Sequence, residues 1–443
     1  MKRMSKTMKR RTLLKSAGGA SALGLLGPLR SLGLVEGGYS GPLLLQVQAN
    51  GGWDVTSYCD PKTNQPGAPV ITNWSKSSDP QQAGGITYAP FANNDWFFQK
   101  HHARTMVING IDLQTNSHTT GVLHNWSGRN AEGYPGLTAL FAANHAPDIA
   151  MPYVNFGGFG ATENIIGFTR LQDNPEMLRR VLEPNLDGYH QPNQHSDYDG
   201  PVTYRREEDL SLIEKHRQAR YERLIASSQG GSREQRNLNA YSDAIKNRTT
   251  LKAFAPYLPS NEETAPDMAM MYTNLKAQVQ IISAAFSAGV SSAADLQLGG
   301  FDTHDDHDAL HAPLLTYLNE SIDLIWQLAE QGGYADRLTV VIGSDFSRTP
   351  NYNSGQGKDH WPIGSVIVMQ DNPTWGSRAT GMTDTGHNAL PVSFDTLELD
   401  EADGSILYPK HVHQALRRLT GIEGSALDAQ FPFLNITTPN FFG

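Results

Sequence analysis

Residues 338–345 read Leu-Thr-Val-Val-Ile-Gly-Ser-Asp, and this stretch decides the fold. A continuous run of aliphatic and β-branched residues that ends at a glycine is typical of a strand buried on both faces. Such strands belong to parallel sheets that helices cover on both sides. Ligands collect at the carboxyl ends of the strands in these sheets, so Asp345, directly after the strand, is a candidate site residue.

Other segments repeat this pattern of strand and polar motif. We expect strands at residues 43–47, 105–108, 294–300 and 365–369, and helices at about 267–287, 310–328 and 408–420. Strands that alternate with helices are the signature of an α/β fold. The sequence therefore predicts a mostly parallel central sheet with helices on both faces.

The N-terminus differs from the rest of the chain. Residues 9–13 read Lys-Arg-Arg-Thr-Leu and precede a mildly apolar stretch rich in Gly and Ala, which resembles a twin-arginine export signal. We expect residues 1–38 to be a leader and the protein to be periplasmic or secreted. No clear cleavage site follows, so removal of the leader and its retention as an anchor both stay open.

The remainder, residues 39–443, is expected to form a single α/β domain. Its composition becomes charged and helix-favouring at about residues 205–253, which predicts a helical insertion. No run of about 18 apolar residues follows the leader, so we expect no transmembrane span there. The one cysteine, Cys59, excludes an intrachain disulfide.

Charge and motifs exclude several classes of partner. The net charge of the whole chain is −10, and it becomes −17 once residues 1–38, with eight Lys or Arg and one Glu, are removed. Such an acidic surface does not suit nucleic acid. Neither a Walker loop nor a dinucleotide-binding fingerprint is present, so no nucleotide cofactor is expected. The sequence does not indicate a protein partner.

Two short motifs carry residues that bind metals. Asp302 and His304 flank one residue after an expected strand, and a carboxylate with an imidazole can bind one divalent ion. The ion would be zinc, or manganese or calcium if oxygen ligands dominate. Asp359 and His360 form a second such pair, and His360 is the candidate ligand there. The alternative for the first motif is an aspartate cap followed by a solvated first helical turn.

Other candidates have more ordinary alternatives. Asp345 could reach a metal, and Arg348 offers a planar fork for phosphate or sulfate oxygens, but the two could simply form an ion pair that closes the loop. Ser117 could be a nucleophile at the start of a helix beside a metal. It could equally be a helix cap, and His118 next to it could be the functional residue instead.

In the order of its motifs the chain resembles the DUF1501 family of exported bacterial proteins. The motifs are the twin-arginine leader, Gly-Gly-x-Asp at 51–54, a Ser-His step at 117–118, Gly-Gly-Phe-Asp-Thr-His at 299–304, Ser-Asp-Phe-Ser-Arg-Thr at 344–349 and Asp-His at 359–360. That family is similar in turn to the alkaline phosphatase and sulfatase superfamily.

This second resemblance implies a role for each matching position. Asp54 would be the early metal ligand, Ser117 the nucleophile, Asp302 and His304 the first ligand pair, Asp345 the next ligand and His360 the last. The chain departs from the superfamily in three places: it has Asp345-Phe346 where an Asp-His dipeptide is usual, its first pair is separated by one residue instead of three, and the Cys-x-Pro-x-Arg segment of sulfatases is absent.

The function expected from the residues and the resemblance is that of an exported metal-dependent hydrolase of phosphate or sulfate esters. Its substrate would be an anionic small molecule or polymer ester, with Ser117 or a hydroxide held by the metal as the attacking group. The alternative is a non-catalytic envelope protein that binds a ligand in a degenerate site of this type. If Asp54, Asp302, His304 and Asp345 share an ion, their side chains should converge on one point.

Overall fold

The computed structural model describes most of the expected α/β domain. The described residues are 38–157, 159–182, 207–228, 254–259 and 273–443, with single positions 230, 231, 238, 242, 247, 251 and 252. The expected leader, apart from its last residue, lies outside this part of the chain. Export and cleavage of the leader therefore stay predictions.

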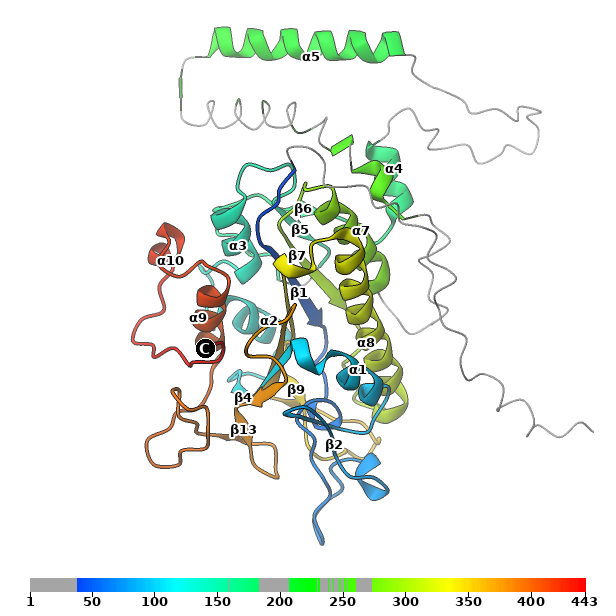
Figure 1. Cartoon of the computed structure of the whole chain (residues 1–443), viewed down its shortest axis with the longest axis vertical. Helices are drawn as coiled ribbons and strands as arrows, with labels where there is room; N and C mark the ends of the chain where they lie inside the picture. The colour runs from blue at the N-terminus through cyan, green and yellow to red at the C-terminus, as the bar shows by residue number, and fades with distance from the viewer. Residues whose placement is uncertain are drawn as a thin grey trace, which may run out of the picture.

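An eight-stranded sheet is the centre of the described structure (Figure 1). Its strands are, in spatial order, β12 (Arg378–Thr380), β4 (Thr105–Asp112), β11 (Ile363–Gln370), β8 (Leu338–Ser344), β1 (Leu43–Ala49), β7 (Ala293–Leu298), β5 (Tyr153–Asn155) and β6 (Thr169–Arg170). All neighbouring pairs are parallel except the two that β11 makes, with β4 and β8. The predicted mostly parallel sheet and its five predicted strands are confirmed.

Helices cover both faces of the sheet, as predicted. On one face lie α1 (Asn94–His101), α7 (Leu275–Ser287) and α8 (His307–Gly332), and on the other lie α2 (His118–Ser127), α3 (Leu137–His145) and α9 (Pro409–Leu419). The strands supply both cores by alternation, because successive strand side chains point to opposite faces. Leu43 and Leu45 of β1 belong to the core under α7 and α8, whereas Leu44 belongs to the core under α2 and α3.

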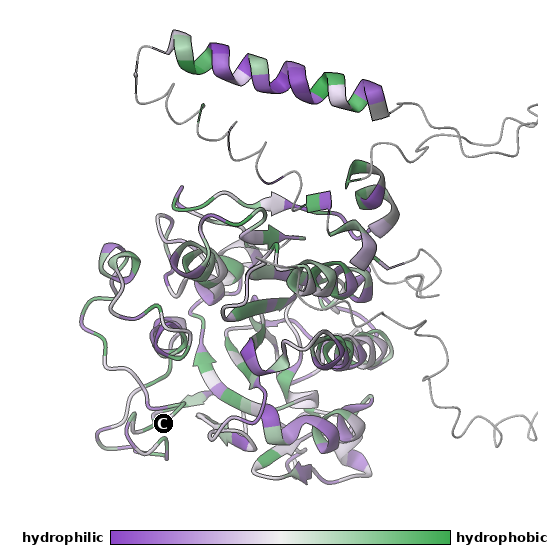
Figure 2. Ribbon diagram, turned by 45° about the horizontal axis from the view of Figure 1, so that its top comes forward, coloured by the Kyte–Doolittle hydropathy of each residue, from purple (hydrophilic) through white to green (hydrophobic). Residues whose placement is uncertain are grey.

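Burial on both faces explains the unbroken apolar runs in the sequence. All seven residues of β1 and all seven of β8 are buried. Figure 2 shows the central strands mainly in green, the colour of hydrophobic residues. The predicted helices at 310–328 and 408–420 correspond to α8 and α9, and the described part of the helix predicted at 267–287 is α7.

The remaining elements are short or lie at the periphery. They are β2 (Gln81–Ala83), β3 (Ile86–Tyr88), β9 (Ser347–Arg348), β10 (His360–Trp361), β13 (Met382–Thr383), β14 (Ala389–Leu390), α4 (Pro175–Leu182), α5 (Glu207–Ser227) and α10 (Ala426–Gln430). Single 3-10 turns lie at Val55–Ser57, Trp74–Lys76, His102–Arg104, Ala255–Tyr257 and Ala335–Arg337. The helix α5 falls inside the insertion predicted at 205–253, and it is mostly hydrophilic in Figure 2. Much of that interval lies outside the described residues, so the extent of the insertion stays a prediction.

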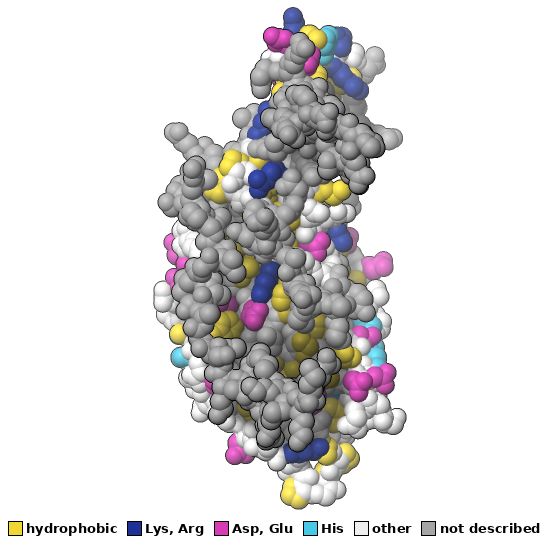
Figure 3. Space-filling view, turned by 90° about the vertical axis from the view of Figure 1, so that its right-hand side faces the viewer, with side chains coloured by type: hydrophobic (Ala, Val, Ile, Leu, Met, Phe, Trp, Pro, Cys, Tyr) yellow, Lys and Arg dark blue, Asp and Glu magenta, His cyan; other side chains and the backbone are white. Residues whose placement is uncertain are grey.

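None of the helices in the described ranges is long and apolar enough to cross a membrane. On the face turned to the viewer in Figure 3, the coloured side chains of Lys and Arg are mixed with those of Asp and Glu. Hydrophobic side chains are visible between them. The described residues on this face do not form one continuous basic surface.

Candidate functional site

The candidate site lies at the edge of the sheet where the parallel strands end. The chain leaves this edge after β1, β4, β7 and β8, and the motifs predicted to carry the chemistry follow these four strands. The strand β11 runs the other way, so the residues just before it also lie at this edge. His360 comes from β10, which pairs with β9. The sheet thus brings residues from widely separated parts of the chain together.

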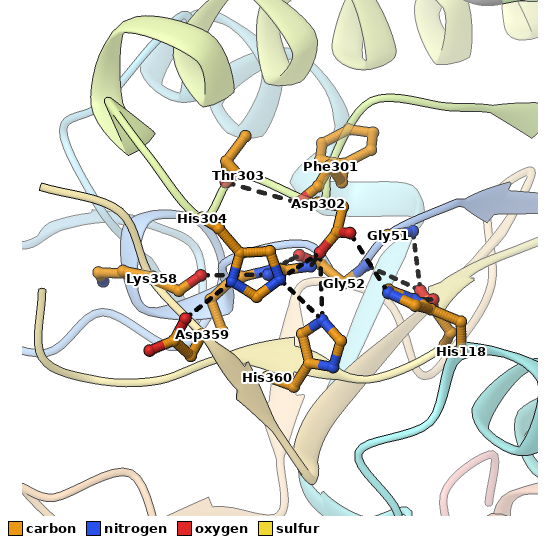
Figure 4. A network of polar contacts seen from close by, with 12 residues as sticks. Gly51, Gly52, His118, Phe301, Asp302, Thr303, His304, Lys358, Asp359 and His360 are labelled. Carbon is orange, nitrogen blue, oxygen red and sulfur yellow. Dashed lines mark hydrogen bonds and ion pairs between the residues drawn. The ribbon is translucent and has the colours of Figure 1, made fainter. Parts of the chain in front are cut away.

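Asp302 is the centre of the site, and three histidines surround its carboxylate (Figure 4). Its Oδ1 lies 3.0 Å from Nε2 of His304 and 3.1 Å from Nε2 of His360. Its Oδ2 lies 3.5 Å from Nε2 of His118. The side chain of Asp302 is 47% exposed, so the cluster is open to solvent and to a substrate.

Each of the three imidazoles is held by its other ring nitrogen. Nδ1 of His118 lies 2.5 Å from Oδ2 of Asp345, and Nδ1 of His304 lies 2.7 Å from Oδ1 of Asp359. Nδ1 of His360 lies 2.7 Å from the carbonyl oxygen of Asn116. Carboxylate and carbonyl oxygens only accept hydrogen bonds, so Nδ1 is the donor in all three. In each neutral imidazole, Nε2 therefore presents a lone pair toward Asp302.

This arrangement fits a divalent metal ion. Nε2 of His304 and Nε2 of His360 lie 3.1 Å apart, so in the neutral rings two lone pairs and a carboxylate oxygen face one another and repel unless a metal ion or an added proton lies between them. Ligand atoms about 2.0–2.2 Å from zinc stand about 2.8–3.6 Å from each other at bond angles of about 90–110°. Imidazoles held by an oxygen acceptor on the far nitrogen are the usual form of metal-binding histidine. Ligand atoms of His118, Asp302 and His360 all lie within 4.8 Å of one another.

Asp345 lies behind this ligand set and holds His118 in place. It is buried, and its Oδ1 accepts hydrogen bonds from the backbone N–H groups of Gly51 and Gly52 at 3.1 and 2.8 Å. Both glycines have positive φ, and a Cβ on Gly51 would stand 2.4 Å from the backbone nitrogen of Asp302. The hydrogen bond to Asp345 raises the pKa of His118, against the opposing effect of partial burial. Asp345, predicted as a ligand, therefore contacts the far nitrogen of a candidate ligand and not the candidate ion site itself.

Arg348 holds Asp302 in place through a hydrogen bond. Its guanidinium is fully buried and donates to the carbonyl oxygens of Gly52 and Lys358, at 2.8 and 3.1 Å, and to Oδ1 of Asp302 at 2.7 Å. Partial burial acts to raise the pKa of Asp302, but the hydrogen bond and charge of Arg348, together with His360 and His304, outweigh it, and the pKa is lowered. Three oxygen acceptors engage the guanidinium of Arg348, which therefore positions Asp302. It does not point to where substrate oxygens would bind, the role that its planar fork had suggested.

Asp54 lies in a second polar layer that is entirely buried. Its Oδ2 accepts from Nζ of Lys358 at 2.8 Å and contacts Nε2 of His307 at 3.0 Å, while Oδ1 accepts from the backbone and hydroxyl of Thr56. The backbone N–H of Asp54 donates to Nε2 of His311. Burial opposes ionisation of Asp54, but Lys358 and His307 outweigh it and hold the pKa of this carboxyl well below its usual range.

The histidines of this buried layer are neutral partners of Asp54. Burial lowers the pKa of both His307 and His311. The hydroxyl of Thr303 lies 2.7 Å from Nδ1 of His307 and 3.3 Å from Nδ1 of His311. Since Thr303 lies between Asp302 and His304, and Lys358 directly precedes Asp359, this layer anchors two of the loops that carry the candidate ligands.

Ser117 lies between two residues that belong to the site. The carbonyl of Asn116 accepts the bond from His360, and His118 is the first residue of α2. The side chain of Ser117 is exposed and makes no capping bond to α2. The first N–H groups of a helix have no partner within it and attract anions. The amino end of α2, with Ser117 before it, therefore opens beside the ligand cluster.

Of the residues predicted for the site, the structure brings Asp302, His304 and His360 together as candidate metal ligands, with His118 as a fourth. Asp345, Asp359 and Arg348 contact these donors and orient them. Of the four side chains expected to converge on an ion, only Asp302 and His304 meet, because Asp54 is turned inward to Lys358. Sequence reasoning missed Lys358 and Thr303. The spacing of His307 and His311 by four residues, one helical turn, was the available signal for the buried pair.

Comparisons with known proteins give a family and a distant structural likeness. A family model described as "Protein of unknown function (DUF1501)" matches residues 42–397. No curated protein matches the chain. Among solved structures, the chain is similar to Ps i-CgsB in complex with k-i-k-neocarrahexaose, with 8% identity, a TM-score of 0.40, and coverage of 91% of this chain and 76% of that one.

Two further structures show the same level of similarity. The lipoteichoic acid synthase LtaP from Listeria monocytogenes is 11% identical with a TM-score of 0.36, over 87% of this chain and 73% of that one. The alkaline phosphatase from the Antarctic bacterium TAB5 is 10% identical with a TM-score of 0.35, over 86% and 99%. Such scores say nothing about the substrate or reaction of this chain, so its function has to be inferred from the residues of the site.

Proposed function

Because the chain belongs to the DUF1501 family, whose function is unknown, we propose a function from the site itself: the protein binds a divalent metal ion and hydrolyses a phosphate or sulfate ester. The single observation that carries the proposal is the orientation of the three imidazoles. His118, His304 and His360 each bind an oxygen acceptor through Nδ1 and direct Nε2 toward Asp302.

The donor set favours zinc. Three imidazole nitrogens and one carboxylate oxygen are ligands that a borderline ion such as zinc prefers, whereas calcium and magnesium prefer oxygen throughout. Three neutral imidazoles and one carboxylate would leave excess positive charge on a divalent ion. When bound, the ion would supply Lewis-acid activation of an ester oxygen that joins the four protein ligands as a fifth.

The residues around the donors suit an anionic group. The amino end of α2 directs its free N–H groups and the positive end of its dipole to the site beside His118. Arg348 is buried against Asp302 and lends positive charge without being exposed. A tetrahedral phosphate or sulfate group next to the ion would have donors on one side and solvent on the other.

Ser117 is the proposed nucleophile. Ser117 is exposed and stands in the chain between His118, a proposed ligand, and Asn116, whose carbonyl holds His360. Its hydroxyl therefore lies close to the proposed metal ligands. A serine hydroxyl needs activation by an adjacent base or a metal before it attacks. Both ring nitrogens of His118 are engaged, Nδ1 with Asp345 and Nε2 as a proposed ligand, so the metal and not His118 would activate Ser117.

The experiment is a measurement of bound metal and of ester hydrolysis on purified full-length protein. We expect about one divalent ion per chain, because the cluster offers a single set of ligands, and its loss in a His304→Ala/His360→Ala variant. The exposed His216 on α5 offers a matched control, since His216→Ala should keep the ion. Ser117→Ala should keep the ion and lose hydrolysis of phosphate or sulfate esters.

Two results would count against the proposal. Full-length protein that binds no ion under any divalent-metal condition would remove the metal centre. Protein that binds the ion but hydrolyses no phosphate or sulfate ester would favour the alternative of a non-catalytic envelope protein that uses the same cluster to hold a ligand. Location in the periplasm, or secretion, is part of the proposal and rests on the leader at residues 1–38.

A further inference from the structure

A groove of about 510 Å³ borders the candidate metal centre. Asp359 belongs to both, because it lines the groove while its Oδ1 binds Nδ1 of His304 at 2.7 Å. Trp361, the neighbour of His360 in β10, lines the groove as well. The groove thus begins about one imidazole ring away from the proposed metal-binding atoms. One molecule could therefore occupy the groove and the metal centre together.

The lining has the chemistry of a site for hydroxyl-rich molecules. Tyr352 and Trp361 supply flat aromatic surface, and amide and hydroxyl side chains supply the polar groups: Gln65, Thr349, Asn351, Asn353, Thr385 and Asn388. Amides and hydroxyls both donate and accept hydrogen bonds, as sugar hydroxyls do. Aromatic faces with a few convergent polar groups are what a specific small-molecule site requires.

Part of this lining is fixed in advance. Asn353 accepts from the backbone N–H groups of Gly355 and Gly357 and donates to the carbonyl of His304, so it shapes the wall. The indole N–H of Trp361 donates to the carbonyl of His387 at 2.7 Å, which sets the plane of its ring. A wall held by such bonds loses little entropy when a ligand binds.

Other side chains in the lining are uncommitted. Asn351 is exposed, and neither its side chain nor that of Thr385 makes a hydrogen bond to the described part of the chain. These two residues and the aromatic rings are therefore the groups able to recognise a ligand.

The charge of the groove is as informative as its polarity. Asp359 is the one charged side chain among the residues that line it, and no Lys or Arg is present there. A second phosphate or sulfate in the groove would meet a carboxylate and no cation, which disfavours it. The groove therefore suits the neutral part of a substrate whose single anionic group lies at the metal centre.

We propose that this groove binds a neutral saccharide unit, so that the substrate is a monoester of a neutral sugar and not a polyanionic chain or a nucleotide. The saccharide site stands on the groove alone. Only its joining to an ester at the metal centre rests on the proposed function.

The test is binding of the full-length protein to a high-density array of neutral, monosulfated and polysulfated oligosaccharides. We expect retention on neutral and monosulfated glycans and weak retention on polysulfated ones. Trp361→Ala should lower the signal at least about tenfold, as expected when a central aromatic anchor is removed. Trp96→Ala is the matched control, because Trp96 is an exposed tryptophan on α1 that does not line the groove.

A second variant guards against misfolding of Trp361→Ala. Asn351→Ala/Thr385→Val removes only uncommitted polar groups and should weaken retention with an unchanged thermal midpoint. Absence of retention on all neutral glycans, a preference for polysulfated glycans, or full retention by both variants would overturn the inference. If neutral glycans bind but no ester is hydrolysed, the groove inference stands and the hydrolase proposal fails; if simple 4-nitrophenyl esters are hydrolysed without glycan binding, the reverse holds.

Discussion

Asp345 holds His118 in the tautomer that a metal ion requires, and the variant Asp345→Asn removes this control while it keeps the size of the side chain. The carbonyl oxygen of an asparagine can still accept from Gly51, Gly52 and Ser344, as Oδ1 of the aspartate does. Its NH₂ group then replaces Oδ2 and faces Nδ1 of His118. Two donors cannot bond, so the proton of His118 moves to Nε2 and the lone pair aimed at the ion is lost.

The expected size of the effect follows from this loss. Removing the partner that orients a metal-binding histidine costs about 10–100-fold in metal affinity. This factor corresponds to about 1.4–2.7 kcal/mol of binding free energy. The fold should survive, because the three bonds that Oδ1 accepts are preserved and no cavity is created.

The assay is competition between the protein and a chelator of known zinc affinity, with bound zinc measured after equilibration. Asp295→Asn is the matched control: Asp295 is another buried aspartate, on β7, and it binds Thr138, Tyr153 and Asn155 away from the site. We expect the control to keep the zinc affinity of the unaltered protein. A folded Asp345→Asn protein with undiminished zinc affinity would refute the assignment of His118 as a ligand held by Asp345.

Three further predictions concern stability and export. Lys358→Met should cost about 3–5 kcal/mol of unfolding free energy in urea, because it leaves the buried Asp54 carboxylate without its cation, and Asp54→Asn in addition should restore part of this loss. Burial raises the pKa of Asp295 from 3.8 to about 7, so its contribution to the free energy of unfolding is full below about pH 4 and is lost as the pH rises through 7. The loss is roughly 4 kcal/mol at most. Denaturation curves of Asp295→Asn measured across this pH range should lack this decline. Arg10→Lys/Arg11→Lys should retain the protein in the cytoplasm in cell fractionation, and unchanged export would remove the twin-arginine prediction.

Much of the fold was predictable because burial on both faces leaves a plain record in the sequence. The apolar runs at residues 43–47 and 338–342 have no alternation, and only a strand covered by helices on both sides needs such a run. The candidate donors Asp302 and His304 were predictable for a related reason. Polar residues directly after a parallel strand have to lie at its carboxyl edge.

The pairing of Asp54 with Lys358 in the buried layer was not predictable from the sequence. Asp54 follows the end of its strand by five residues, much as Asp302 follows its own by four, and the sequence does not show that the carboxylate of Asp54 turns inward to a buried lysine. Lys358 lies in a loop rich in Gly and Asn, where a lysine is usually exposed. Its burial depends on Asp54, which is distant in sequence, so only the three-dimensional structure reveals the pair.

The reversed direction of β11 has a consequence for how this site can change. Because β8 and β11 are antiparallel neighbours, the chain between them leaves and returns at the same edge without a crossover helix. One continuous excursion, residues 345–362, therefore carries His360, the residues Asp345, Arg348 and Asp359 that hold the other candidate ligands, and Trp361 with the 349–353 wall of the groove. Exchanges at uncommitted positions of this loop, such as Asn351, would change which ligands the groove binds while the eight-stranded sheet and the candidate ligands on other loops keep their places, so new preferences can evolve through one surface loop.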